Sequence, residues 1–121
     1  MTDRATSVHH RNDLEFGPKA QRLERLLERF LTDVESARGA ITAGDVMARV
    51  AAIDHALEIV RDIEAALDHG AAPALAANVR SLLDLVDQRL QEANQTMKVG
   101  PLDPCVRIIG ELLAALRDRP R

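Results

Sequence analysis

Aromatic residues are almost missing from this chain of 121 residues. Phenylalanine occurs twice, at Phe16 and Phe30, and there is no tryptophan or tyrosine. The hydrophobic part of the chain, 46% of its residues, is therefore mainly leucine, isoleucine, valine and alanine. Alanine and leucine favour helices, whereas strands favour aromatic and β-branched residues. The composition predicts an all-α protein, and the lack of aromatic rings excludes a stacking platform for single-stranded nucleic acid.

Three further absences narrow the class of protein. Cys105 is the only cysteine, which excludes a disulfide within the chain and a cysteine-based metal site. A formal net charge of −3 provides no basic surface for DNA or RNA. No apolar run approaches the roughly 18 residues that cross a bilayer, and residues 1–16 lack the apolar stretch of a secretory signal. We therefore expect a cytoplasmic protein that neither binds nucleic acid nor inserts into a membrane.

Apolar residues recur at steps of three and four positions in four separate segments, which is the spacing of amphipathic helices. The segments span residues 18–43, 46–67, 73–97 and 104–119. Because the connections between them are short, neighbouring helices should run antiparallel. We predict an antiparallel up-down four-helix bundle over residues 18–119, preceded by a flexible N-terminal tail over residues 1–17.

Residues between the segments predict how the helices end and begin. Gly44 should end the first helix in a left-handed conformation, and Asp45 should cap the second helix through its carboxylate. Asp103 is followed by Pro104, a residue that helices tolerate in the first turn. This order predicts that Asp103 caps the fourth helix.

No arrangement of side chains in the sequence predicts catalysis. A di-metal site in a four-helix bundle needs Glu-x-x-His motifs, and neither His55 nor His69 has glutamate at that spacing. We interpret His55 as a solvent-facing or boundary histidine rather than a metal ligand. Cys105, near the start of a helix, is interpreted as a small buried hydrophobe rather than a reactive thiol. We therefore expect no catalytic residue, no metal ligand and no cofactor.

Three residues lie beside the apolar stripes rather than within them. Leu83 and Leu85 flank the stripe of the third helical segment, and Ile59 flanks that of the second. Such residues are either buried because a helix is covered on several sides, or exposed as a partner-binding strip. For Leu83 we expect burial, and for Leu85 a surface position.

Three segments, in this order, resemble the flagellin export chaperone family, FliS. The first is A-x-x-A-I-x-x-G-D at residues 37–45, and the second is the helical segment at residues 53–68. The third, residues 75–94, ends in L-L-D-L-V-x-x-R-L-x-E-A-N and resembles the family signature L-Y-D-Y-M-x-x-R-L-x-x-A-N. Leucine stands at residues 83 and 85 in place of the family's tyrosines, which keeps apolar volume but removes the hydroxyl groups.

The resemblance implies a chaperone that acts by binding and without chemistry. Such a protein binds the disordered C-terminal segment of flagellin in the cytoplasm, prevents premature polymerisation, and has the flagellar export apparatus as a further partner. Binding would follow the helix-in-groove mode, in which an apolar strip receives an amphipathic segment. The client-binding residues implied are Ile59, Asn78, Leu83, Leu85 and Asn94. The two asparagines would bond the client backbone, and for Asn94 a helix C-cap role is equally open.

A second function remains open from the sequence alone. The same apolar strip could be buried in a homodimer, which would make the protein a self-associating structural or adaptor bundle with a different client. The sequence therefore predicts either a monomer or a homodimer.

Overall fold

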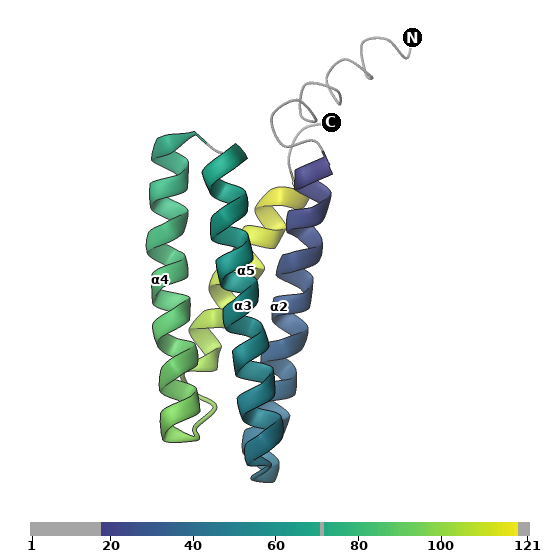
Figure 1. The fold of residues 1–121 in the computed structure, drawn as a ribbon, viewed down its shortest axis with the longest axis vertical. Coiled ribbons are helices and arrows are strands. Elements are labelled where there is room, and N and C mark those ends of the chain that lie inside the picture. The colour runs from purple at the N-terminus through teal and green to yellow at the C-terminus, as the bar shows by residue number, and fades with distance from the viewer. Residues whose placement is uncertain (1–17, 71, 119–121) are drawn as a thin grey trace.

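The computed structural model describes residues 18–70 and 72–118, and this part of the chain contains helices and no strand (Figure 1). The helices are α2 (Pro18–Ala43), α3 (Val46–Gly70), α4 (Pro73–Thr96) and α5 (Leu102–Arg117). Consecutive helices run in opposite directions, and α2 also packs against α5, which closes the bundle. The predicted antiparallel up-down four-helix bundle is confirmed. The predicted flexible tail, residues 1–17, lies outside the described residues.

The turn between α2 and α3 has the residues that its backbone requires. Gly44 adopts a left-handed conformation with φ 72°, and its N–H donates to the Ile41 carbonyl at 3.1 Å. The next N–H, that of Asp45, donates to the Ala40 carbonyl at 2.9 Å. The Asp45 carboxylate accepts a hydrogen bond of 3.0 Å from the Ala48 N–H. The predicted roles of Gly44 and Asp45 are both confirmed.

The prediction that Asp103 caps α5 is wrong. The helix begins at Leu102, and no side chain bonds its first N–H groups. The N–H groups of Leu102 and Asp103 already donate to the carbonyls of Val99 and Gly100, so the turn starts upstream of the expected cap. The Asp103 carboxylate instead accepts a hydrogen bond from Arg38 of α2 at 3.1 Å. Asp103 therefore joins two helices rather than capping one.

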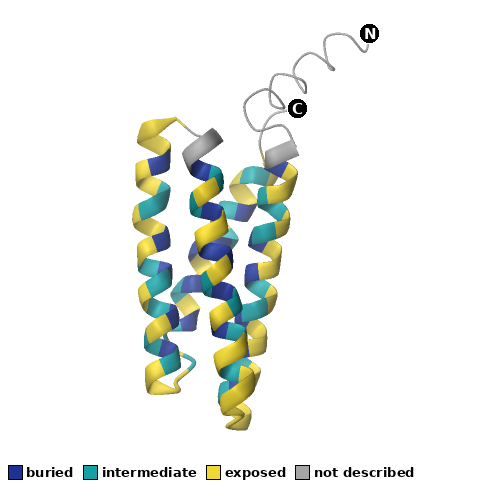
Figure 2. Cartoon of the chain, in the orientation of Figure 1, coloured by how far each residue is buried: buried dark blue, intermediate teal, exposed yellow. Residues whose placement is uncertain are grey.

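The core is aliphatic, and Phe30 is its only aromatic side chain among the described residues. No polar or charged side chain is buried in this part of the chain. Figure 2 shows buried positions recurring along the inward side of each helix. Each large side chain buried in this way contributes about 1.5–3 kcal/mol to folding. The largest fully buried side chains are Phe30, Leu27, Ile53, Ile63, Leu83, Leu90, Leu102 and Ile109.

Helix α5 does not follow α4 along its whole length. It begins beside the C-terminal half of α4, where the Cys105 Sγ lies 3.6 Å from the Val86 carbonyl oxygen. It ends beside α2, where Arg117 forms an ion pair with Glu28 (Figure 1). The diagonal course of α5 leaves the N-terminal half of α4 packed mainly against α3.

Alanine substitution at two glycines should change the free energy of unfolding in opposite directions. A Cβ at Gly110, within α5, would meet no atom within 4 Å. Alanine there should stabilise the protein by about 0.5–1 kcal/mol, because glycine weakens a helix interior. Gly44 is the matched control, since it also has open space around it but has φ 72°. Gly44→Ala should destabilise by about 1 kcal/mol. Urea denaturation measures both, and a shift of equal sign in the two variants would contradict the description.

Candidate functional site

The described residues provide neither a metal centre nor a membrane span. No group of three or more His, Cys, Asp or Glu side chains in this part of the chain could hold a metal ion. None of its helices is both long enough and apolar enough to cross a bilayer. Individual polar side chains and the surface are therefore the candidates for a functional site.

His55 lies at the seam between α3 and α2, which confirms the boundary position expected for it. Its Nδ1 is 2.5 Å from the Asp33 carboxylate, and its Nε2 is 3.3 Å from the Arg29 guanidinium. A guanidinium has only donors, so Nε2 accepts from Arg29 while Nδ1–H donates to Asp33. His55 thus links the two helices through polar contacts at both ring nitrogens.

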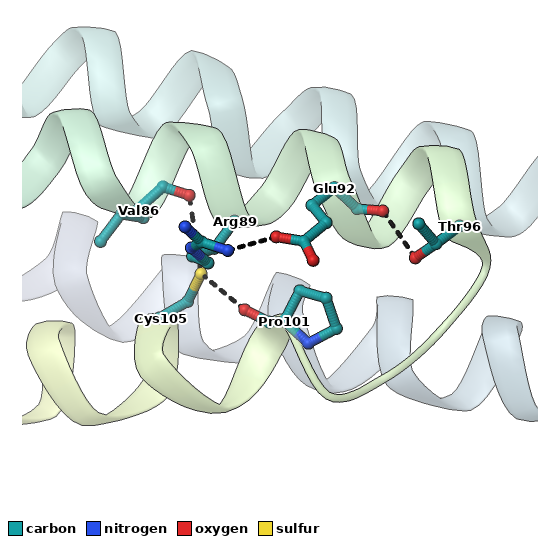
Figure 3. A network of polar contacts seen from close by, with 6 residues as sticks. All are labelled: Val86, Arg89, Glu92, Thr96, Pro101 and Cys105. Atoms are coloured by element: carbon teal, nitrogen blue, oxygen red, sulfur yellow. Dashed lines mark hydrogen bonds and ion pairs between the residues drawn. The ribbon is translucent and has the colours of Figure 1, made fainter.

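Cys105 is a buried thiol, as the sequence predicted. Its side chain is fully buried, and its Sγ lies 3.6 Å from the carbonyl oxygens of both Val86 and Pro101 (Figure 3). Burial raises the pKa of the Cys105 thiol to about 12, and the opposing effect of the Arg89 charge is smaller. Arg89 itself is ion-paired with Glu92. The thiol is therefore part of the core and not a nucleophile.

The protonation of Cys105 gives a test of its burial. The pKa is 9.0 for an unperturbed thiol and about 12 in the folded protein, so unfolding releases a more acidic thiol. The stabilising contribution is complete below about pH 9 and is lost as the pH rises towards 12. At pH 8 we expect iodoacetamide to alkylate the native protein at least about a hundredfold more slowly than the guanidinium-unfolded protein. Equal rates would contradict the burial of this thiol.

Six large hydrophobic side chains are exposed in the described residues, and they fall into two groups. One group, Leu75 and Leu82, lies along the N-terminal half of α4. The other lies at the opposite end of the bundle, near the turns that join α2 to α3 and α4 to α5. Its members are Val46, Met47, Val50 and Met97.

The first group belongs to a larger surface, which we call the α4 face. It consists of Leu75, Asn78, Leu82 and Leu85, whose spacing of three, seven and ten residues places them on one side of the helix. Leu75 is 48% exposed and Leu82 is 39% exposed, Asn78 is exposed, and Leu85 is half-buried against the edge of the core. Two of the five predicted client-binding residues, Asn78 and Leu85, thus share a face with two exposed leucines. The sequence did not single out Leu75 and Leu82, because their spacing also fits a core stripe.

Ile59 and Leu83 lie in the core. Their side chains are 3% and 0% exposed, so neither reaches the α4 face. The burial expected for Leu83 is confirmed. A client contact in the closed bundle requires a surface position, and neither residue has one. Their role in binding stays a prediction.

Asn94 joins α4 to α3. Its Oδ1 accepts a hydrogen bond of 3.0 Å from Arg49 Nε. The C-cap of α4 is Met97, whose N–H donates to the Ala93 carbonyl, so Asn94 lies about one turn before the cap. The C-cap role expected as one possibility for Asn94 is therefore not observed, and its contact with a client stays a prediction.

The described part of the chain is a closed helical bundle with an aliphatic core and with exposed leucines on one face of α4. The sequence matches the family model described as "Flagellar protein FliS" over residues 1–118. The chain therefore belongs to the FliS family, which confirms the resemblance drawn from its motifs. This is a family of flagellar export chaperones and not of enzymes. No curated protein matches the chain closely enough to count as a relative.

Proposed function

We propose that this protein is a cytoplasmic chaperone that binds the disordered C-terminal segment of flagellin and prevents its premature polymerisation. The flagellar export apparatus would be the second partner, to which the loaded chaperone delivers its client. The observation that carries the proposal is the α4 face in a chain of the FliS family. A monomeric soluble domain gains nothing from leucines left in water along one helix face, whereas a partner helix would bury them.

The course of α5 explains how a client helix would fit. Leu75 and Leu82 are exposed on the N-terminal half of α4, from which α5 diverges towards α2, so a client helix lying there would contact both. With exposed fractions of 48% and 39%, burying these two side chains would contribute about 1 kcal/mol each. Ordering a disordered client costs conformational entropy, so binding needs several further contacts along the segment.

The α4 face has one uncharged polar side chain, and this shapes the recognition expected of it. Leu85 replaces a tyrosine of the family signature, so the hydroxyl that would donate or accept there is missing. The exposed carboxamide of Asn78 can both donate and accept, and would bond the client backbone. Recognition would therefore rest on apolar contact, with Asn78 fixing the position of the client along α4.

Calorimetry with a peptide from the C-terminal end of the cognate flagellin tests this proposal. We expect wild-type protein to bind with a negative heat-capacity change, because apolar surface is buried. Leu82→Glu should weaken binding about tenfold or more, since it places a charge in the interface. Stability should change by less than about 1 kcal/mol, because the site is on the surface.

The matched control is Ala65→Glu, which adds the same charge at an exposed position on α3. It should bind the peptide as wild type does. No binding of wild-type protein at about 100 μM peptide would contradict flagellin as the client. Equal binding by Leu82→Glu and wild type would contradict the location on α4.

A further inference from the structure

The α4 face is followed, on the same side of the helix, by two charged side chains. Arg89 and Glu92 come four and seven positions after Leu85, so the residues on this side continue to recur at steps of four and three. Arg89 Nη1 donates to a Glu92 carboxylate oxygen, and the two form an ion pair. Their side chains are 37% and 45% exposed. A helix packed on the α4 face would therefore meet a half-exposed cation where the apolar side chains end.

Arg89 lies at the junction between α4 and α5. Figure 3 shows its guanidinium beside Cys105, the α5 residue whose buried Sγ lies 3.6 Å from the Val86 carbonyl oxygen of α4. The charge of Arg89 is close enough to this thiol to act against the effect of burial on the thiol pKa. Arg89 therefore marks the place where the exposed apolar stretch of α4 that begins at Leu75 gives way to the contact with α5.

The guanidinium has donors for a second carboxylate. An arginine side chain has five N–H donors in a planar fork, and the bond to Glu92 uses Nη1. Within the described residues no other carboxylate contacts Arg89, so its Nε and Nη2 can donate to an incoming one. A client packed on the neighbouring leucines would exclude water, which strengthens such a pair relative to one in open solvent.

We propose that Arg89 sets the register of the client on α4 by pairing with an aspartate or glutamate side chain of the client helix. This inference rests on the proposed function and adds the chemistry of the segment that is bound. The client helix then has apolar side chains opposite the leucines of the α4 face and a carboxylate about one turn beyond the last of them. A client moved by one turn would place an apolar side chain against the Arg89–Glu92 pair and leave its carboxylate unpaired.

Two neutral variants with opposite expected effects test this role. The probe is the C-terminal flagellin peptide with an amidated end, in which side chains are the only carboxylates. Arg89→Gln removes the cation and should weaken binding about threefold or more. Glu92→Gln removes the competing carboxylate and should tighten binding, because Arg89 then pairs with the client alone. A pair that served only to hold α4 would make both variants bind more weakly.

The salt dependence of binding is the second measurement. Calorimetry at about 50 mM and about 500 mM salt should show weaker wild-type binding at the higher concentration, because salt screens the pair. Arg89→Gln should lose most of this dependence. Arg89→Lys keeps the charge but not the planar fork, so it should retain the salt dependence and most of the affinity.

The matched control is Arg25→Gln, which removes the same charge from an exposed position on α2. Because α2 packs against α3 and α5, this change lies away from the α4 face and should leave binding as in wild type. Urea denaturation checks the folding of every variant. Arg89 and Glu92 are both partly exposed, so their variants should fold.

Three results would overturn the role of Arg89. One is an Arg89→Gln variant with wild-type affinity and salt dependence. The second is weaker binding by both Arg89→Gln and Glu92→Gln. The third is a dependence on Arg89 that is present with a free-acid peptide and absent with the amide, which would place the terminal carboxylate of the client at Arg89. In all three the wild-type protein still binds the peptide, so the proposed function stands, whereas absence of wild-type binding contradicts the proposed function itself.

Discussion

The length and course of α5 determine which surfaces this protein exposes. Helix α5 has 16 residues and α4 has 24, which correspond to about 24 Å and about 36 Å at 1.5 Å per residue. Helix α5 therefore could not cover α4 even if the two lay side by side. Helix α5 also crosses towards α2, where Arg117 pairs with Glu28, and Leu75 and Leu82 are exposed on the N-terminal half of α4.

An aliphatic core holds the four helices in this arrangement. The described core has no buried polar or charged side chain, and the Cys105 thiol gives the Val86 carbonyl only a weak hydrogen bond. Polar links lie instead at the seams, where Asp103 meets Arg38, His55 meets Asp33, and Asn94 meets Arg49. Exposed ion pairs contribute about 0–1 kcal/mol each, so most of the stability comes from aliphatic packing. The seam bonds link α2 to α5, α2 to α3, and α3 to α4.

The sequence predicted the four helices and the turn between α2 and α3 well, because these depend on local chemistry. Apolar spacing located the four segments, and Gly44 followed by Asp45 marked the turn between the first two. The prediction that Asp103 caps α5 is wrong although Asp-Pro suits a cap. Backbone hydrogen bonds to the carbonyls of Val99 and Gly100 start the helix before Asp103. Its carboxylate instead accepts a hydrogen bond from Arg38, which lies 65 positions away in the sequence. No local pattern indicates a contact between residues so far apart.

The candidate site was only partly predictable for the same reason. Asn78 and Leu85 were singled out from the family signature, and both lie on the α4 face. Leu75 and Leu82 have the spacing of core residues, but both are exposed in the folded bundle. Leu83 and Ile59 are covered by neighbouring helices. Spacing along one helix states which residues share a face, but only the tertiary arrangement decides whether that face is covered.

The near absence of aromatic residues now has a structural meaning. Leucine at residue 83 fills the core as an apolar side chain must, and leucine at residue 85 lies at the edge of the α4 face. The bundle is therefore preserved without the tyrosines of the family signature, while Asn78 is the one polar side chain of the α4 face. A FliS-family chaperone of this kind would hold its client mainly through aliphatic contacts.

Methyl NMR of the protein titrated with the C-terminal segment of its flagellin tests whether the α4 face is the surface that binds the client. We expect the methyl resonances of Leu75, Leu82 and Leu85 to shift together and to saturate at one equivalent of peptide. Core methyl groups such as those of Leu90 should move little. Shifts confined to Val46 and Val50 at the other end of the bundle, or no shifts at saturating peptide, would contradict binding at the α4 face.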